Sequence, residues 1–175
     1  RKLRTSERGD IVKRAQNAMQ AALDTVWQKH DPALDGMIPS PQLLLVLAAL
    51  IEKETDLPAE WPIVARVFLN RLQKGMKLQT DPTVIYAITH GNPPLGRALT
   101  RTDLATPDAY NTYVVTGLPP GPICSPGMSA LEAAAHPASG DALFFVANGN
   151  GGHNFSTTLA EHNRNVSAFR QHNTH

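Results

Sequence analysis

The chain has 175 residues, 42% of them apolar and 18% charged, a balance typical of one ordinary globular domain. Its formal net charge of +1 gives no strong field toward nucleic acid or an acidic membrane surface, so we expect neither as a partner. The longest apolar run, residues 43–51, is much shorter than the about 20 residues that a membrane-spanning helix needs. A single cysteine, Cys124, excludes an internal disulfide.

The first half of the chain predicts two helices joined by a loop. Residues 9–30 form an amphipathic pattern that Asp10 can cap, and residues 31–40 read as the loop. The next helix opens with Ser40 as N-cap and Pro41 in its first turn, and its body is apolar on every side, which indicates a buried core helix. The inward stripe of the first helix consists of Ile11, Ala15, Ala18, Ala22 and Val26.

Further helices follow in the middle of the chain. A third helix begins after Pro58 and can end at Gly75, and a short fourth helix has Asp81 as its cap and Gly91 at its end. Residues 111–117, NTYVVTG, are rich in β-favouring side chains and predict a strand. The inward stripe of the third helix consists of Trp61, Val64, Ala65, Phe68, Leu69 and Leu72.

The last part of the chain predicts a short helix from Ser125 to the residue before Pro137, then a β-hairpin over residues 141–156. A final helix begins near Thr158, and its inward residues are Leu159, Val166 and Phe169.

The elements together predict an α+β fold, in which helices pack around a buried core helix and a small antiparallel hairpin follows. We interpret residues 1–40 as an N-terminal helix and loop that lead into a domain of residues 41–175, the two forming one compact unit. The basic start, residues 1–10, is interpreted as a solvated linker end.

The stretch LAALIEKETDLP, residues 47–58, ends an apolar helix with two acids, Glu52 and Glu54. Residues two apart on a helix point about 200° away from each other, so the two acids cannot share one role. Glu54 lies at the helix C-terminus against an apolar wall, and both features raise a carboxyl pKa toward neutrality, as a general acid requires. The plainer alternative is that both acids are surface residues at a helix end.

Two further stretches offer polar groups for binding. Gln79, Thr80 and Asp81 stand just before a helix, where their amide, hydroxyl and carboxylate suit sugar hydroxyls and acetamides, although capping alone could explain Asp81. Asn111 and Tyr113 stand beside a rigid loop of prolines and glycines that can form either a binding wall or a plain structural loop.

Common catalytic motifs do not occur in this sequence. It contains no HExxH, CxxC or GxSxG pattern. The late histidines, His153, His162, His172 and His175, have no metal-ligand spacing. We therefore expect no metal and no cofactor, and the sequence argues against metallohydrolases and serine hydrolases.

Several long ordered motifs resemble the YceG-like family. They are LIEKETDLPAEWPIVARVFLNRLQKGMKLQTDPTVIYAI, AYNTYVVTGLPPGPICSPG, ALEAAAHP and FFVANGNGGHNFSTTLAEHN, and together they cover about residues 43–163. The family's N-terminal membrane helix and LysM-like subdomain do not occur in this sequence, so the resemblance implies a catalytic-domain fragment.

The resemblance implies an endolytic lytic transglycosylase, a carbon–oxygen lyase that cleaves peptidoglycan between N-acetylmuramic acid and N-acetylglucosamine without water and leaves 1,6-anhydro ends. It implies Glu54 in the EKET motif as the catalytic acid, with Glu52 as the fallback. Two alternatives stay open: a hydrolase with Glu54 as acid and Asp81 as base, and a glycan-binding module without turnover. The residues expected to line the glycan cleft are Gln79, Thr80, Asp81, Asn111 and Tyr113.

The resemblance also implies a cellular setting. Its substrate would be glycan strands in bacterial cell wall biogenesis, and its partners would be peptidoglycan synthases whose nascent strands it terminates. It implies the periplasmic face of the inner membrane, reached through an N-terminal anchor outside this chain.

Overall fold

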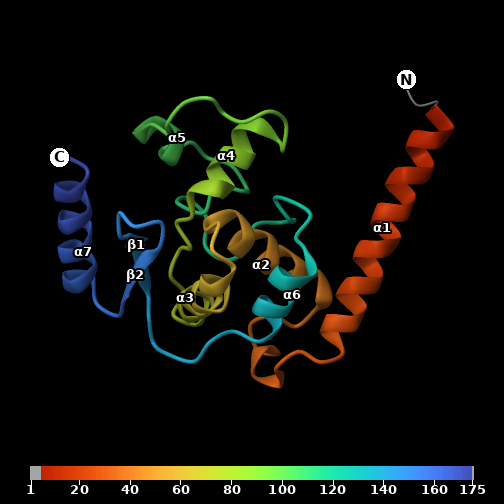
Figure 1. Cartoon of the computed structure of the whole chain (residues 1–175), viewed down its shortest axis with the longest axis horizontal. Helices are drawn as coiled ribbons and strands as arrows, with labels where there is room; N and C mark the ends of the chain where they lie inside the picture. The colour runs from red at the N-terminus through yellow and green to blue at the C-terminus, as the bar shows by residue number, and fades with distance from the viewer. Residues whose placement is uncertain (1–4, 175) are drawn as a thin grey trace.

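The computed structural model describes residues 5–174, so residues 1–4 of the predicted solvated start and His175 lie outside the described range. Within that range the chain forms seven α-helices, two short 3-10 helices and one two-stranded antiparallel hairpin (Figure 1). The chain is thus mostly helical with a small β element, and the predicted α+β class is confirmed at this level.

The helix α2 (Pro41–Glu54) forms the centre of the molecule, as the sequence predicts. Ser40 caps it by accepting a hydrogen bond from the Leu43 amide at 3.3 Å, and every residue from 46 to 51 is buried. A helix that is apolar all round needs neighbours on every side. Four helices supply them: α1 (Thr5–Trp27), α3 (Trp61–Gln73), α4 (Asp81–Thr89) and α6 (Met128–Ala135).

Only the last turns of α1 join this core. Leu23 and Val26 are buried, whereas residues 5–18 are exposed along their whole length, and α1 projects from the body of the molecule (Figure 1). The prediction that Ile11 faces inward is wrong, since 51% of its surface is exposed. An apolar stripe forms a buried face only where another element covers it, and none of the described residues covers this half of the helix.

The hairpin and the last helix form a second layer beside α3. The strands β1 (Phe144–Ala147) and β2 (His153–Ser156) pair antiparallel, and α7 (Leu159–His172) packs against both. These predictions are confirmed, as is the N-cap at Thr158. Leu159 does not point inward, since it is the first helical residue and is 58% exposed.

The strand predicted at residues 111–117 is wrong, because this segment forms turns. The amides of Val114 and Val115 donate to the Asn111 carbonyl, which closes a turn that no neighbouring strand could extend. β-propensity describes a fit to a pleated sheet surface, and no such surface lies here. Three short helices were not predicted: η1 (Pro32–Leu34), η2 (Pro58–Glu60) and α5 (Arg101–Ala105).

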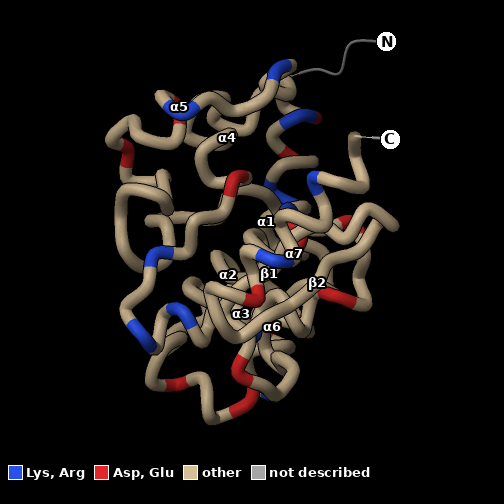
Figure 2. The backbone as a smooth tube through the Cα atoms, turned by 90° about the vertical axis from the view of Figure 1, so that its left-hand side faces the viewer, with Lys and Arg blue, Asp and Glu red and all other residues tan. Residues whose placement is uncertain are grey.

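Within residues 5–174, no helix combines the length and apolar character needed to cross a membrane. Figure 2 shows basic and acidic residues interspersed along the backbone rather than gathered by sign.

Candidate active site

A cavity of about 310 Å³ opens where the end of α2, the start of α4, the hairpin and α7 meet. Its lining combines three sequence-predicted polar residues and Glu54 with an arginine, a histidine and several apolar side chains. The lining residues are Glu54, Arg71, Leu78, Gln79, Asp81, Tyr113, Phe145, Val146, His162 and Val166.

Glu54 is the last residue of α2, and its carboxyl lies largely out of water at the cavity wall. Burial raises the pKa of Glu54 from its ordinary value of 4.5 to about 7. The hydrogen bond from Thr80 opposes that rise in pKa, and the negative charge of Asp81 adds to it. A large fraction of Glu54 is therefore protonated at neutral pH and able to donate its proton.

Thr80 orients the Glu54 carboxyl. Its hydroxyl donates to Glu54 Oε2 at 2.5 Å instead of capping α4, although Thr80 is the N-cap residue of that helix. The Thr80 amide donates to Thr112 Oγ1 at 3.0 Å, and the Thr83 hydroxyl donates to the Thr80 carbonyl at 2.8 Å. Because this threonine cluster is buried, Thr80 holds one oxygen of Glu54 in place and leaves the other to carry the proton. Thr80 itself does not line the cavity.

Asp81 is not the N-cap that the sequence predicts. Thr80, with extended backbone angles, takes that position, and Asp81 is the first helical residue. The Asp81 carboxylate instead accepts a hydrogen bond from the Tyr113 hydroxyl at 2.5 Å, so the two side chains form one pair on the cavity wall. Burial, then Asp81, raises the pKa of Tyr113 well above its ordinary value, so the phenol keeps its proton.

Gln79 lines the cavity from a strained backbone position. Its φ of +50° lies in the left-handed region, which a non-glycine residue enters at a cost of about 1 kcal/mol or more. The backbone N–H of Gln79 donates to the Thr112 carbonyl at 3.2 Å, which helps to hold this conformation. Its side chain is exposed at the cavity and free to meet a ligand.

The structure places Asn111 away from the cavity, unlike the expectation from sequence. Asn111 is 1% exposed, and its side-chain amide donates to the carbonyls of Leu104 and Thr106 at the end of α5. Its side-chain oxygen accepts the Tyr113 amide at 2.9 Å. Asn111 therefore positions Tyr113 through the backbone and has no free group for a ligand.

Glu52, the fallback acid, points away from Glu54. Its Oε1 accepts the Gly127 amide at 2.9 Å, at the start of α6, and its Oε2 accepts the Cys124 thiol at 3.6 Å. Glu52 thus fastens the proline-rich loop to α2 and does not line the cavity.

Two further lining residues, Arg71 and His162, were not predicted from the sequence. Arg71 is 8% exposed, its guanidinium donates to the carbonyls of Leu143 and Lys77 at 2.7 and 2.8 Å, and it lies 5.1 Å from the centre of the Phe144 ring. A signal was available for Arg71, since it follows Val64 and Phe68 at helical spacing in a buried stripe, where a charge is unusual. His162 lies on α7, and nothing local linked that helix to Glu54.

A second polar network fastens the chain just after Glu54. Glu60 accepts hydrogen bonds from the His153 amide at 2.8 Å and the Thr55 hydroxyl at 3.0 Å, and its Oε2 lies 2.7 Å from His153 Nδ1. The Trp61 indole donates to the Thr55 carbonyl at 3.0 Å. The end of α2, the start of α3 and the hairpin are thereby joined beside the cavity.

A largely buried carboxyl group with a pKa raised to about 7, on a cavity wall and with one oxygen already held, is an arrangement suited to general acid catalysis. The YceG-like family matches residues 3–168, and the chain belongs to that family.

Three known proteins document the similarity. The chain is 50% identical over 121 residues to the endolytic murein transglycosylase of Bacillus subtilis strain 168, covering 69% of this chain and 32% of that protein. It is 33% identical over 154 residues to the endolytic murein transglycosylase of Streptococcus pneumoniae serotype 2, covering 85% of this chain and 27% of that protein. A crystal structure of a yceG-like protein from Listeria monocytogenes superposes with a TM-score of 0.65 at 43% identity, covering 75% of this chain and 42% of that one. This chain therefore spans about a third or less of the curated relatives named here.

Proposed function

We propose that this chain is a lytic transglycosylase that cleaves peptidoglycan strands internally, between N-acetylmuramic acid and N-acetylglucosamine. The observation that carries the proposal is the Glu54 carboxyl, held at the cavity wall with a pKa raised to about 7. The names of two relatives, both endolytic murein transglycosylases, supply the substrate class.

Glu54 first acts as an acid. Its proton passes to the glycosidic oxygen, the bond from that oxygen to C1 of the muramic acid breaks, and N-acetylglucosamine leaves as an alcohol. Positive charge develops on C1, and the sugar's own acetamide can shield it. Thr80, by donating to Oε2, stabilises the carboxylate that this step creates.

Glu54 then acts as a base. Its carboxylate accepts the proton of the muramic acid C6 hydroxyl, and O6 bonds to C1, which closes a 1,6-anhydro ring. The substrate supplies its own nucleophile, so the reaction needs no second protein carboxylate, unlike the usual two-acid glycosidase scheme. Glu54 ends the cycle protonated, as it began.

Other cavity residues would position the sugars. General acid–base action contributes typically about 10²–10⁴-fold, so orientation of the substrate must supply the rest. Gln79 offers a free amide, and Asp81 and Tyr113 offer a pre-formed hydrogen-bonded pair. Arg71 adds a buried cation that makes no salt bridge within residues 5–174 and can bind a carbonyl oxygen of the substrate.

A hydrolase is the second candidate, and one observation favours it. Asp81 lines the same cavity and lies near enough to Glu54 to raise its pKa, so it could activate a water molecule. Against this role, Asp81 Oδ1 already accepts the Tyr113 hydroxyl, so this oxygen is occupied and less available to a water molecule.

The proposed substrate implies action outside the cytoplasm, at the cell wall. We include in the same proposal that the protein terminates nascent strands beside peptidoglycan synthases. It would act at the periplasmic face of an inner membrane, held there by an anchor outside this chain.

Digestion of purified sacculi, read by mass spectrometry, tests the proposal. We expect fragments one water lighter than hydrolysis products, with ends that borohydride does not reduce. Glu54→Gln should release none, whereas Glu132→Gln, at an exposed carboxylate on α6, should release as much as the parent chain. Hydrated, reducible ends that disappear in Asp81→Asn would identify the hydrolase, and no release by the parent chain would favour a binding module.

A further inference from the structure

A second and larger cavity, of about 690 Å³, adjoins the candidate active site. Two pairs of consecutive residues link the two cavities. Lys53 and Pro82 line the second cavity, and their chain neighbours Glu54 and Asp81 line the candidate active site. Because consecutive Cα atoms are about 3.8 Å apart, the two cavities share a thin wall at the end of α2 and the start of α4. A substrate bound at Glu54 therefore has this second space within reach.

The second cavity has an apolar part, and its walls are held in place by packing. Ile85 on α4 and Ile123 in the proline-rich loop face it. The Tyr86 ring packs on Tyr110 at a centroid distance of 4.8 Å, and the Tyr110 hydroxyl lies so close to Gly121 that an added Cβ would stand 2.8 Å from it. A site whose walls are already packed loses little entropy when it binds a ligand.

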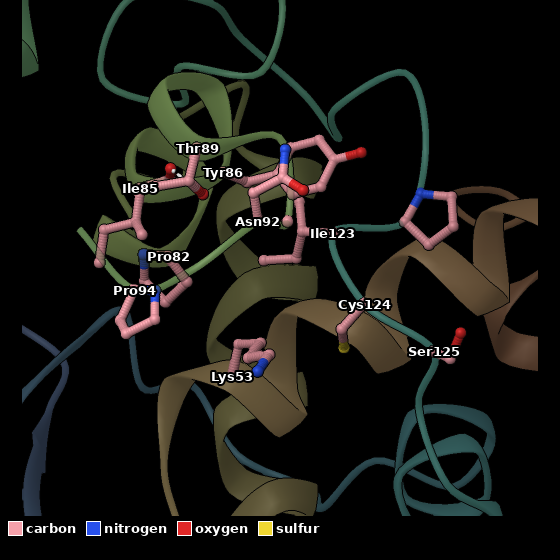
Figure 3. Close-up of a pocket in the computed structure, with 12 residues that line it drawn as sticks. Lys53, Pro82, Ile85, Tyr86, Thr89, Asn92, Pro94, Ile123, Cys124 and Ser125 are labelled. Carbon is pink, nitrogen blue, oxygen red and sulfur yellow. Dashed lines mark hydrogen bonds between the residues drawn. The ribbon is translucent and has the colours of Figure 1, made fainter. Parts of the chain in front are cut away.

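The polar groups of this cavity suit binding rather than chemistry. Lys53 is its only charged lining residue, is exposed, and makes no ion pair within the described part of the chain. Burial, with the neighbouring Glu52, raises the pKa of the Cys124 thiol to about 11, so it is no nucleophile at neutral pH. Figure 3 shows Lys53 and Asn92 on opposite sides of the space, with Pro82 and Pro94 along one flank and Cys124 along the other.

This lining fits a peptide better than a sugar. Thr89, Asn92 and Ser125 offer hydrogen bonds that a peptide or a sugar could use. No carboxylate lines this cavity, however, and its one aromatic ring is already packed, which favours the peptide. Three prolines and two isoleucines offer surfaces for methyl groups, and the ammonium group of Lys53 offers a partner for a carboxylate. The matching ligand is a short anionic peptide with small apolar side chains.

We propose that the second cavity binds the peptide stem that a peptidoglycan strand carries on its muramic acid, with Lys53 pairing with a stem carboxylate. This inference rests on the proposed function, and it adds a preference for strands that still bear stems.

The test compares kcat/KM on two preparations of one batch of glycan strands, one with stems intact and one from which an amidase has removed them. For the parent chain we expect faster cleavage of stem-bearing strands. Lys53→Glu should lower the ratio of the two kcat/KM values roughly fivefold, since it replaces an attraction with a repulsion. Asn92→Asp, which adds an anion at an exposed position without changing shape, should lower the ratio less. The ratio of the two kcat/KM values is not changed by any effect that Lys53→Glu has on the acid Glu54, because such an effect applies equally to both substrates.

The matched control is Lys74→Glu, a charge reversal at an exposed residue beyond the end of α3, which should leave the ratio unchanged. If the parent chain cleaves both preparations and Lys53→Glu keeps the parental ratio, the peptide site is refuted and the proposed function stands. If the parent chain cleaves neither preparation, the proposed function fails and the inference fails with it.

Discussion

At the scale of single residues, burial and a hydrogen bond act on the pKa of Glu54 in opposite directions. Burial makes the charged form of the carboxyl costly and so keeps it largely protonated near neutral pH. Thr80 lowers that cost by donating to Oε2, and the buried threonine cluster keeps Thr80 in place. The acid is therefore uncharged often enough to donate and stable enough as a carboxylate to accept a proton back.

Glu54→Gln should change the pH dependence of stability. The folded chain keeps the Glu54 proton up to about pH 7, whereas the unfolded chain loses it near pH 4.5, so the free energy of unfolding falls as pH rises through that window. Glutamine carries no such charge and can still accept the Thr80 hydrogen bond. Urea denaturation should find the variant about as stable as the parent chain at pH 4.5 and more stable at pH 8.5, by at most about 3 kcal/mol. Equal stabilities at both pH values would contradict a buried Glu54.

At the scale of elements, the end of α2 is fastened by Glu60, which ties Thr55 to His153 at the start of β2. Desolvation alone would raise the pKa of Glu60, but the hydrogen bonds from His153 and Thr55 together lower it below its ordinary value. The network therefore stabilises the fold above the ordinary carboxyl range, and that contribution is lost as pH falls through the lowered pKa. Gly152 allows the close approach, because a Cβ there would lie 2.9 Å from Glu60 Oε1.

Glu60→Gln should loosen the hairpin more than it unfolds the core. It removes a charged acceptor from three part-buried hydrogen bonds, at a cost of about 1–3 kcal/mol. Hydrogen exchange should rise over residues 144–156 while α2 stays protected. The control Asp56→Asn, at an exposed neighbour in the chain, should leave both regions unchanged. Equal exchange in the hairpins of parent and variant would show that the network does not hold this element.

Elements whose signals are local could be predicted from the sequence. Ser40 and Thr158 cap their helices as expected, and the apolar run of α2 is buried as its pattern requires. Residues 111–117 were not predictable in this way, because their strand-like composition needed a partner strand that the fold does not provide. The prediction that Ile11 faces inward was wrong for a similar reason, because no other described element covers that half of α1.

At the scale of the whole molecule, the candidate site joins parts of the chain that lie far apart in sequence. Glu54, Gln79, Asp81 and Tyr113 were singled out by residue type and local position, and the fold places all four on one cavity. Arg71 and the α7 residue His162 complete that cavity, but only the packing of the hairpin against α3 and α7 brings them there. The hydrophobic periodicity of the sequence describes one helix or strand at a time, so it cannot predict which side chains from different elements line the same cavity.

The projecting half of α1 lies outside this assembly. Removing residues 1–17 should change the free energy of unfolding by less than about 1 kcal/mol, because residues 5–17 are exposed throughout. Leu23→Ala, within the packed part of α1, should cost about 2–5 kcal/mol. Urea denaturation of both variants checks this, and a large loss of stability on truncation would mean that the projecting half packs against something.

The claim on which the enzymatic account depends is that Glu54 carries its proton near neutral pH. Carbon-13 NMR of the glutamate side-chain carboxyls, recorded from pH 3 to pH 9 and assigned by the signal missing in Glu54→Gln, measures this directly. The account predicts that this one carboxyl titrates near pH 7. Titration of Glu54 near 4.5, like an ordinary glutamate in water, would contradict it.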